Sequence, residues 1–150
     1  MKRTRIVEAV TWILVLLFAY TGFSKLFSLQ QFETVLWQAP LIGPRAGLVA
    51  RAVPITELII AGALVIPALQ QKALWAAFIL LVLFTAYLGY MLTLSSHLPC
   101  QCGGVISSMS WQAHLLFNLF FIGLTAYSLF VNNSGNTNYR SSAHRQIIHA

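Results

Sequence analysis

The sequence predicts an all-α integral membrane protein, a four-helix bundle with both termini in the cytoplasm. Of its 150 residues, 58% are hydrophobic and only 8% are charged, whereas soluble domains carry about 25% charged residues. The apolar residues fall into four runs, each close to the roughly 20 residues that a helix needs to cross a bilayer. Four such spans leave little of the chain for a soluble catalytic domain.

The four predicted spans make up a membrane domain over residues 1–131, with helices at about 6–23, 51–69, 73–94 and 111–131. The second contains Glu57 and has Pro54 near its start, where a missing N–H costs little. The third carries neither a charge nor a proline, and the fourth carries His114 and Asn118 in its first two turns. Residues 132–150 are polar and have little to bury, so we expect a disordered cytoplasmic tail.

The basic residues predict the orientation, because Lys and Arg accumulate on the cytoplasmic side of a membrane protein. With a cytoplasmic N-terminus, six lie inside (Lys2, Arg3, Arg5, Lys72, Arg140 and Arg145) and three outside (Lys25, Arg45 and Arg51). This predicts a multi-pass protein of the bacterial inner membrane, with the loop Ser24 to Leu48 and the segment 95–110 facing the periplasm. The basic residues form no stripe, so the expected partner is the lipid bilayer and not nucleic acid.

The segment 95–110 contains both cysteines of the chain, Cys100 and Cys102, separated by one residue. As a structural disulfide they would close a loop of only three residues, worth about 1.6 kcal/mol against about 3 for a 15-residue loop. Bridging residues i and i+2 also requires a tight turn, which Pro99, Gly103 and Gly104 favour. Strained, exposed disulfides exchange readily, so a redox-active pair is favoured over a structural one.

A metal site is the third alternative for this pair. His97, Cys100, Cys102 and His114 together supply two imidazoles and two thiolates, which could hold zinc or copper(I). The spacing C-x-C is tighter than the C-x(2 to 4)-C typical of structural zinc sites.

Four further polar residues are predicted at the same depth as the cysteines. Ionisable groups inside spans are costly, so Glu57 needs a partner, and Lys25 lies at the same level. His114 and Asn118 are i and i+4 and therefore share one face of their helix. Packing alone could explain each pair, but a nearby cation or imidazole would also help to form a thiolate or move protons.

These residues resemble a known family. Tyr20-Thr21-Gly22-Phe23-Ser24-Lys25, Pro54-Ile55-Thr56-Glu57-Leu58, Cys100-Gln101-Cys102-Gly103-Gly104 and His114-Leu115-Leu116-Phe117-Asn118 occur in the order seen in the MauE branch of the DoxX-like membrane proteins. The resemblance implies a redox-associated inner-membrane protein that supports maturation of methylamine dehydrogenase alongside a periplasmic thioredoxin-like protein. The matching site residues are Lys25, Glu57, Cys100, Cys102, His114 and Asn118.

The sequence therefore predicts thiol–disulfide exchange at Cys100 and Cys102, with a periplasmic thioredoxin-like protein or a client protein as partner. Such a protein would be a thiol–disulfide oxidoreductase. With a single cysteine pair, the electrons must pass directly to a membrane acceptor, for which a quinone is a candidate, or to another protein. The alternatives are an assembly factor without enzymatic activity and a Cys/His metal carrier.

Overall fold

The computed structural model describes residues 2–39, 42–94 and 111–148, and shows five α-helices in them. Four are long: α1 (Lys2–Phe27), α3 (Ala46–Val65), α4 (Gln70–Leu94) and α5 (Trp111–Ile148). Within these residues, four stretches are long and apolar enough to cross a membrane: Arg5–Phe27, Gly43–Val65, Gln70–Thr93 and Gln112–Val131. The predicted four-helix membrane fold is therefore confirmed.

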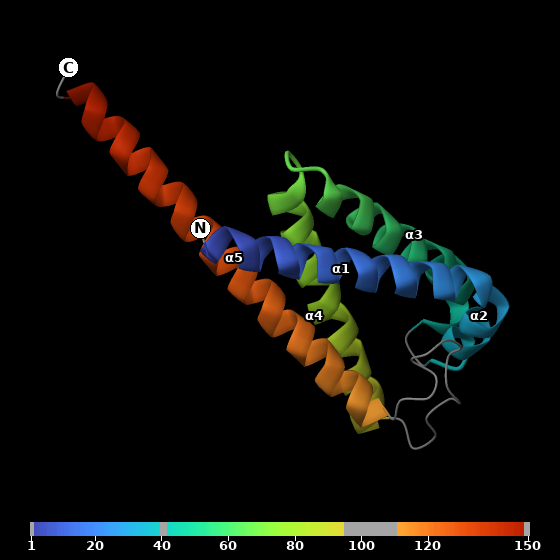
Figure 1. Ribbon diagram of the computed structural model, residues 1–150. Coiled ribbons are helices and arrows are strands. Elements are labelled where there is room, and N and C mark those ends of the chain that lie inside the picture. The colour runs from blue at the N-terminus through green and yellow to red at the C-terminus, as the bar shows by residue number, and fades with distance from the viewer. Residues whose placement is uncertain (1, 40–41, 95–110, 149–150) are drawn as a thin grey trace.

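The helices pack mainly as two antiparallel pairs, α1 with α3 and α4 with α5, joined by contacts of α3 with α4 and of α1 with α5 (Figure 1). Side chains from all four fill the core between the pairs, including Leu14, Phe18, Leu64, Leu74 and Phe121. Large apolar side chains such as Leu16, Ile59, Leu83 and Phe130 are exposed on the outside, as expected for helices that face lipid.

A short helix that the sequence reading missed lies in the predicted loop Ser24 to Leu48. The helix α2 (Leu29–Trp37) is followed by a 3-10 turn, η1 (Gly43–Arg45). Leu29, Phe32 and Leu36 recur at helical spacing and pack on Ala46 and Ala50 at the start of α3. Nine residues are too few to cross a bilayer, so α2 lies against one end of the bundle.

Several helix boundaries differ from the predicted ones, most of all the start of α3 and the end of α5. α3 begins at Ala46 instead of residue 51, so Pro54 lies inside the helix and is buried. α5 continues to Ile148, where a disordered tail from residue 132 was expected, and its end extends beyond the other helices (Figure 1). Residues 132–148 contain no proline, so nothing sterically ends the helix that begins in the membrane.

α1 approaches α3 closely at Gly22. A Cβ atom there would lie 3.0 Å from Leu58 Cγ and 3.2 Å from the Pro54 carbonyl oxygen. Small residues at such crossings let two membrane helices approach closely and gain van der Waals contact. Gly22 therefore sets the spacing between the two helices that carry Lys25 and Glu57.

We expect Gly22→Leu to destabilise the protein by about 1–3 kcal/mol, because the larger side chain would force α1 and α3 apart. Gly62→Leu on α3 is the matched control, since a Cβ at Gly62 meets nothing within 4 Å. The free energy of unfolding in mixed micelles checks this. Equal effects of the two substitutions would contradict the close crossing at Gly22.

Candidate functional site

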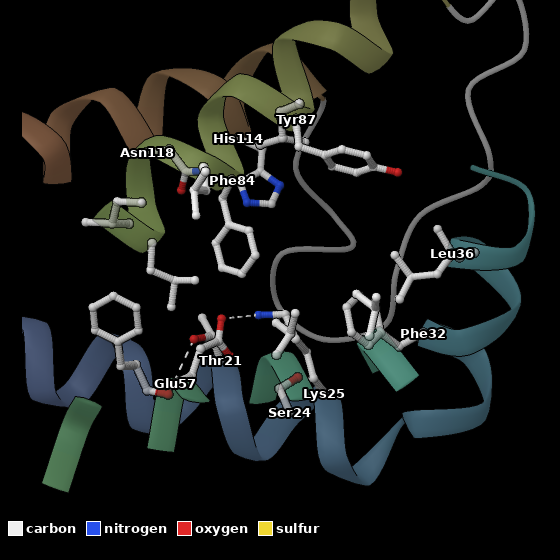
Figure 2. Close-up of a pocket in the computed structure, with 18 of the residues that line it drawn as sticks. Thr21, Ser24, Lys25, Phe32, Leu36, Glu57, Phe84, Tyr87, His114 and Asn118 are labelled. Atoms are coloured by element: carbon white, nitrogen blue, oxygen red, sulfur yellow. Dashed lines mark hydrogen bonds and ion pairs between the residues drawn. The ribbon is translucent and has the colours of Figure 1, made fainter. Parts of the chain in front are cut away.

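The candidate site is a polar cluster in a largely apolar pocket at the end of the bundle that holds α2, the last turns of α4 and the first turns of α5. Its volume is about 420 Å³, and every one of the five α-helices contributes to the lining. Lys25, Glu57, His114 and Asn118, the four supporting residues predicted from the sequence, all line it (Figure 2).

Lys25 and Glu57 form the predicted ion pair, with Lys25 Nζ donating to Glu57 Oε1 over 2.6 Å. Helical side chains tilt toward the N-terminus of their own helix. Because α1 and α3 are antiparallel, the two side chains lean toward each other along the bundle. The side chain of Glu57 is only 2% exposed and that of Lys25 is 22% exposed, so the pair is largely shielded from solvent.

His114 and Asn118 lie across the pocket from the ion pair, on α5, with Phe84 of α4 between the two groups (Figure 2). Lys25 Nζ lies 5.5 Å from the centre of the Phe84 ring, a distance that allows a cation–π interaction. Asn118 is buried and His114 is half-buried. The spacing i, i+4 therefore places both side chains on the pocket face of α5, as predicted.

The two cysteines and His97 lie outside the described residues. The flanking helices are described: α4 ends at Leu94 and α5 begins at Trp111, both at the pocket end of the bundle. The metal alternative stays a prediction, because three of its four ligands lie in the intervening segment. Among the residues that the structure describes, no group of three His, Cys, Asp or Glu side chains could hold a metal ion.

The sequence reading missed the aromatic and apolar part of the site. Phe32 and Leu36 reach the pocket from α2, and their helical spacing in the predicted loop Ser24 to Leu48 was the available signal. Phe84 gave no signal, because one aromatic residue among the apolar residues of a membrane span has no distinguishing pattern. Thr21 also lines the pocket, and its hydroxyl donates to the Phe18 carbonyl over 3.4 Å.

The fold and the site together define a multi-pass helical membrane protein with a buried ion pair and a polar pocket at one end of its bundle. The family model for methylamine utilisation protein MauE matches residues 3–131. The chain therefore belongs to the MauE family. No curated protein and no solved structure matches the sequence.

Removing one member of the buried pair should destabilise the protein strongly. We expect Lys25→Met to cost about 3–5 kcal/mol of unfolding free energy, because it leaves Glu57 buried without a counter-charge. The double variant Lys25→Met/Glu57→Leu should recover most of this loss, since it removes both charges. Denaturant titrations in mixed micelles measure each value.

A matched control is the pair of Arg51 and Glu33, whose Nη1 and Oε2 atoms are 3.8 Å apart and whose side chains are 59% and 31% exposed. Arg51→Met should cost at most about 1 kcal/mol, because exposed ion pairs are worth little. A loss for Lys25→Met that is no larger than the loss for Arg51→Met would contradict the importance of the buried pair.

Proposed function

We propose that the protein supports maturation of a periplasmic protein by thiol–disulfide exchange at Cys100 and Cys102. The observation that carries the proposal is the convergence of Lys25, Glu57, His114 and Asn118 in one pocket at the end of the bundle where α4 ends and α5 begins. The sequence segment with the two cysteines connects these two helix ends. Membership of the MauE family supports a role in methylamine utilisation. The client that we propose is a methylamine dehydrogenase-like protein.

The exchange step is balanced in atoms and electrons. A thiolate of the partner attacks the Cys100–Cys102 disulfide and forms a mixed disulfide, and the partner's second thiolate then releases it. The partner is oxidised by two electrons, and Cys100 and Cys102 are reduced to a dithiol. The dithiol then passes two electrons and two protons to an acceptor and becomes a disulfide again. We propose a membrane quinone as this acceptor, which is reduced to a hydroquinone.

The polar cluster gives the residues that could assist this chemistry. A thiolate is the attacking species in exchange, and a nearby cation lowers the pKa of a cysteine thiol. Lys25 carries a positive charge, which Glu57 balances in part over 2.6 Å, while the imidazole of His114 can accept and return protons. Asn118 lies one turn further along α5 and presents an amide to the same pocket. These roles are electrostatic and acid–base, and the sulfur atoms perform the covalent chemistry.

Replacing one cysteine should trap the partner. Exchange is reversible, so in Cys100→Ala or Cys102→Ala the remaining thiolate can attack the disulfide of the oxidised partner and form a mixed disulfide. The second cysteine that would release the partner is missing, so we expect one variant to accumulate a covalent complex with a periplasmic protein. Non-reducing electrophoresis after rapid acid quenching and alkylation detects it, and reductant should dissolve it. The double variant Cys100→Ser/Cys102→Ser is the control and should trap nothing.

The absence of a mixed disulfide in both single variants, with the partner present, would contradict exchange and favour an assembly factor without enzymatic activity. Metal analysis of the purified protein distinguishes the remaining alternative. A stoichiometric zinc or copper ion that is lost in the double cysteine variant would favour a metal carrier.

A second prediction concerns activation of the thiols. If the pocket residues act on the cysteines, His114→Ala and Lys25→Ala should shift the pH profile of thiol alkylation to higher pH, because less thiolate forms at a given pH. Thr93→Ala is a control, since Thr93 lies on α4 near the same end of the bundle but is exposed and does not line the pocket. Unchanged profiles in both pocket variants would contradict a role in activation.

A further inference from the structure

The pocket contains space beyond the four polar side chains Lys25, Glu57, His114 and Asn118. It encloses about 420 Å³ between two groups of packed side chains, one deep in the bundle and one where α2 covers α3. Phe18 and Leu81 of the deep group line it, as do Leu36 and Val49 of the group at α2. Ligand pockets have volumes in this range and combine an apolar lining with a few converging polar groups.

One carboxylate oxygen in this pocket has an unmet hydrogen bond. Glu57 is 1% exposed, and its Oε1 accepts from Lys25, whereas Oε2 has no hydrogen-bond partner in the described part of the chain. The Thr21 hydroxyl lies beside the carboxylate but donates to the Phe18 carbonyl over 3.4 Å. Leaving a buried acceptor unpaired costs about 1–3 kcal/mol, and more when it is charged. A ligand that donates an O–H or N–H at this position would remove that cost.

The charges of the pocket favour a neutral ligand. Lys25 and Glu57 balance each other over 2.6 Å, so a charged ligand would place an additional unbalanced charge in a medium of low polarity. An ammonium group has three N–H donors, and the bond to Glu57 uses one of them. The ion pair thus presents both an acceptor and spare donors to a neutral polar head.

The lining favours a flat ring on the ligand. Phe32, Phe84, Tyr87 and Phe117 contribute aromatic side chains from three different helices, and Figure 2 shows Phe32, Phe84 and Tyr87 around the space beside the ion pair. Aromatic rings pack well against other rings in stacked or edge-to-face arrangements. Apolar side chains of the same pocket could accommodate a hydrocarbon tail.

We propose that the pocket binds a neutral, lipid-soluble hydroquinone, with a ring hydroxyl donating to Glu57 Oε2 and Lys25 Nζ donating to a ring oxygen. The binding rests on the described residues alone. Its role rests on the proposed function, because a hydroquinone is the product when a quinone takes two electrons and two protons from the dithiol of Cys100 and Cys102.

The experiment compares the reduced and the oxidised form of one ligand, which differ in the two hydroxyl hydrogens and in the change from an aromatic to a quinonoid ring. Decylubiquinol and decylubiquinone are titrated anaerobically into the purified full-length protein in nanodiscs, and the bound fraction is measured by ligand depletion. Only the hydroquinone can donate to Oε2, so we expect it to bind at least about tenfold more tightly than the quinone. Equal affinities, or no saturable binding of either ligand, would overturn the proposal.

The variants locate the effect. Glu57→Leu/Lys25→Met removes both charges and nearly conserves side-chain volume, so the variant should fold. Its helix content and its elution volume in size-exclusion chromatography can verify this. The folded variant should lose the preference for the hydroquinone. Glu33→Gln changes a carboxylate outside the pocket and should keep the preference. A preference that persists in the double variant would overturn the assignment to Glu57.

Two further binding measurements complete the experiment. One tests whether the ligand requires a ring, and the other tests whether binding is independent of thiol exchange. Monoolein has hydroxyl donors but no ring, and binding as tight as that of decylubiquinol would overturn the preference for a ring. Cys100→Ser/Cys102→Ser should bind decylubiquinol normally. Hydroquinone binding without mixed-disulfide trapping would support the pocket assignment and refute exchange. Trapping without hydroquinone binding would support exchange and refute the pocket assignment.

Discussion

The ion pair between Lys25 and Glu57 is the interaction on which the rest of the structure depends. A carboxylate buried inside an apolar bundle is unfavourable without a counter-charge, and Lys25 supplies it over 2.6 Å. The pair fixes α1 against α3 next to the close crossing at Gly22. It also forms the polar wall of the pocket, across from His114 and Asn118. Helix packing and site chemistry therefore share the same two residues.

The parts of the fold that follow from hydropathy were predictable. Four long apolar runs define four spans. Because a charge inside a membrane is costly, the sequence also identified Lys25 as the partner of Glu57. The short helix α2 was not predicted, because a segment of nine residues gives a weak signal beside four long apolar runs. The start of α3 was placed too late, because Arg51 was taken as a flank although it lies in the helix and its guanidinium bonds back to the Gly47 carbonyl.

The pocket itself could not have been predicted from the sequence. It depends on how α1, α3, α4 and α5 pack around one space and on α2 adding to its lining, and neither property is encoded in the pattern of any single segment. The sequence placed the four polar residues at one depth, and the structure adds the aromatic lining and the space between them. Polar residues, an aromatic lining and open space together are typical of a binding site, whereas polar residues that only pack against each other leave no such space.

The order of the helices along the chain has a consequence for biosynthesis. An ionised side chain at the centre of a span costs roughly 2.5–3.5 kcal/mol during membrane insertion. α1 leaves the ribosome before α3, so the ammonium of Lys25 is already in place when the segment with Glu57 reaches the bilayer. Nascent α3 can therefore enter by docking on α1, and a change that weakens their contact would lower the yield of inserted protein before it affects the mature form.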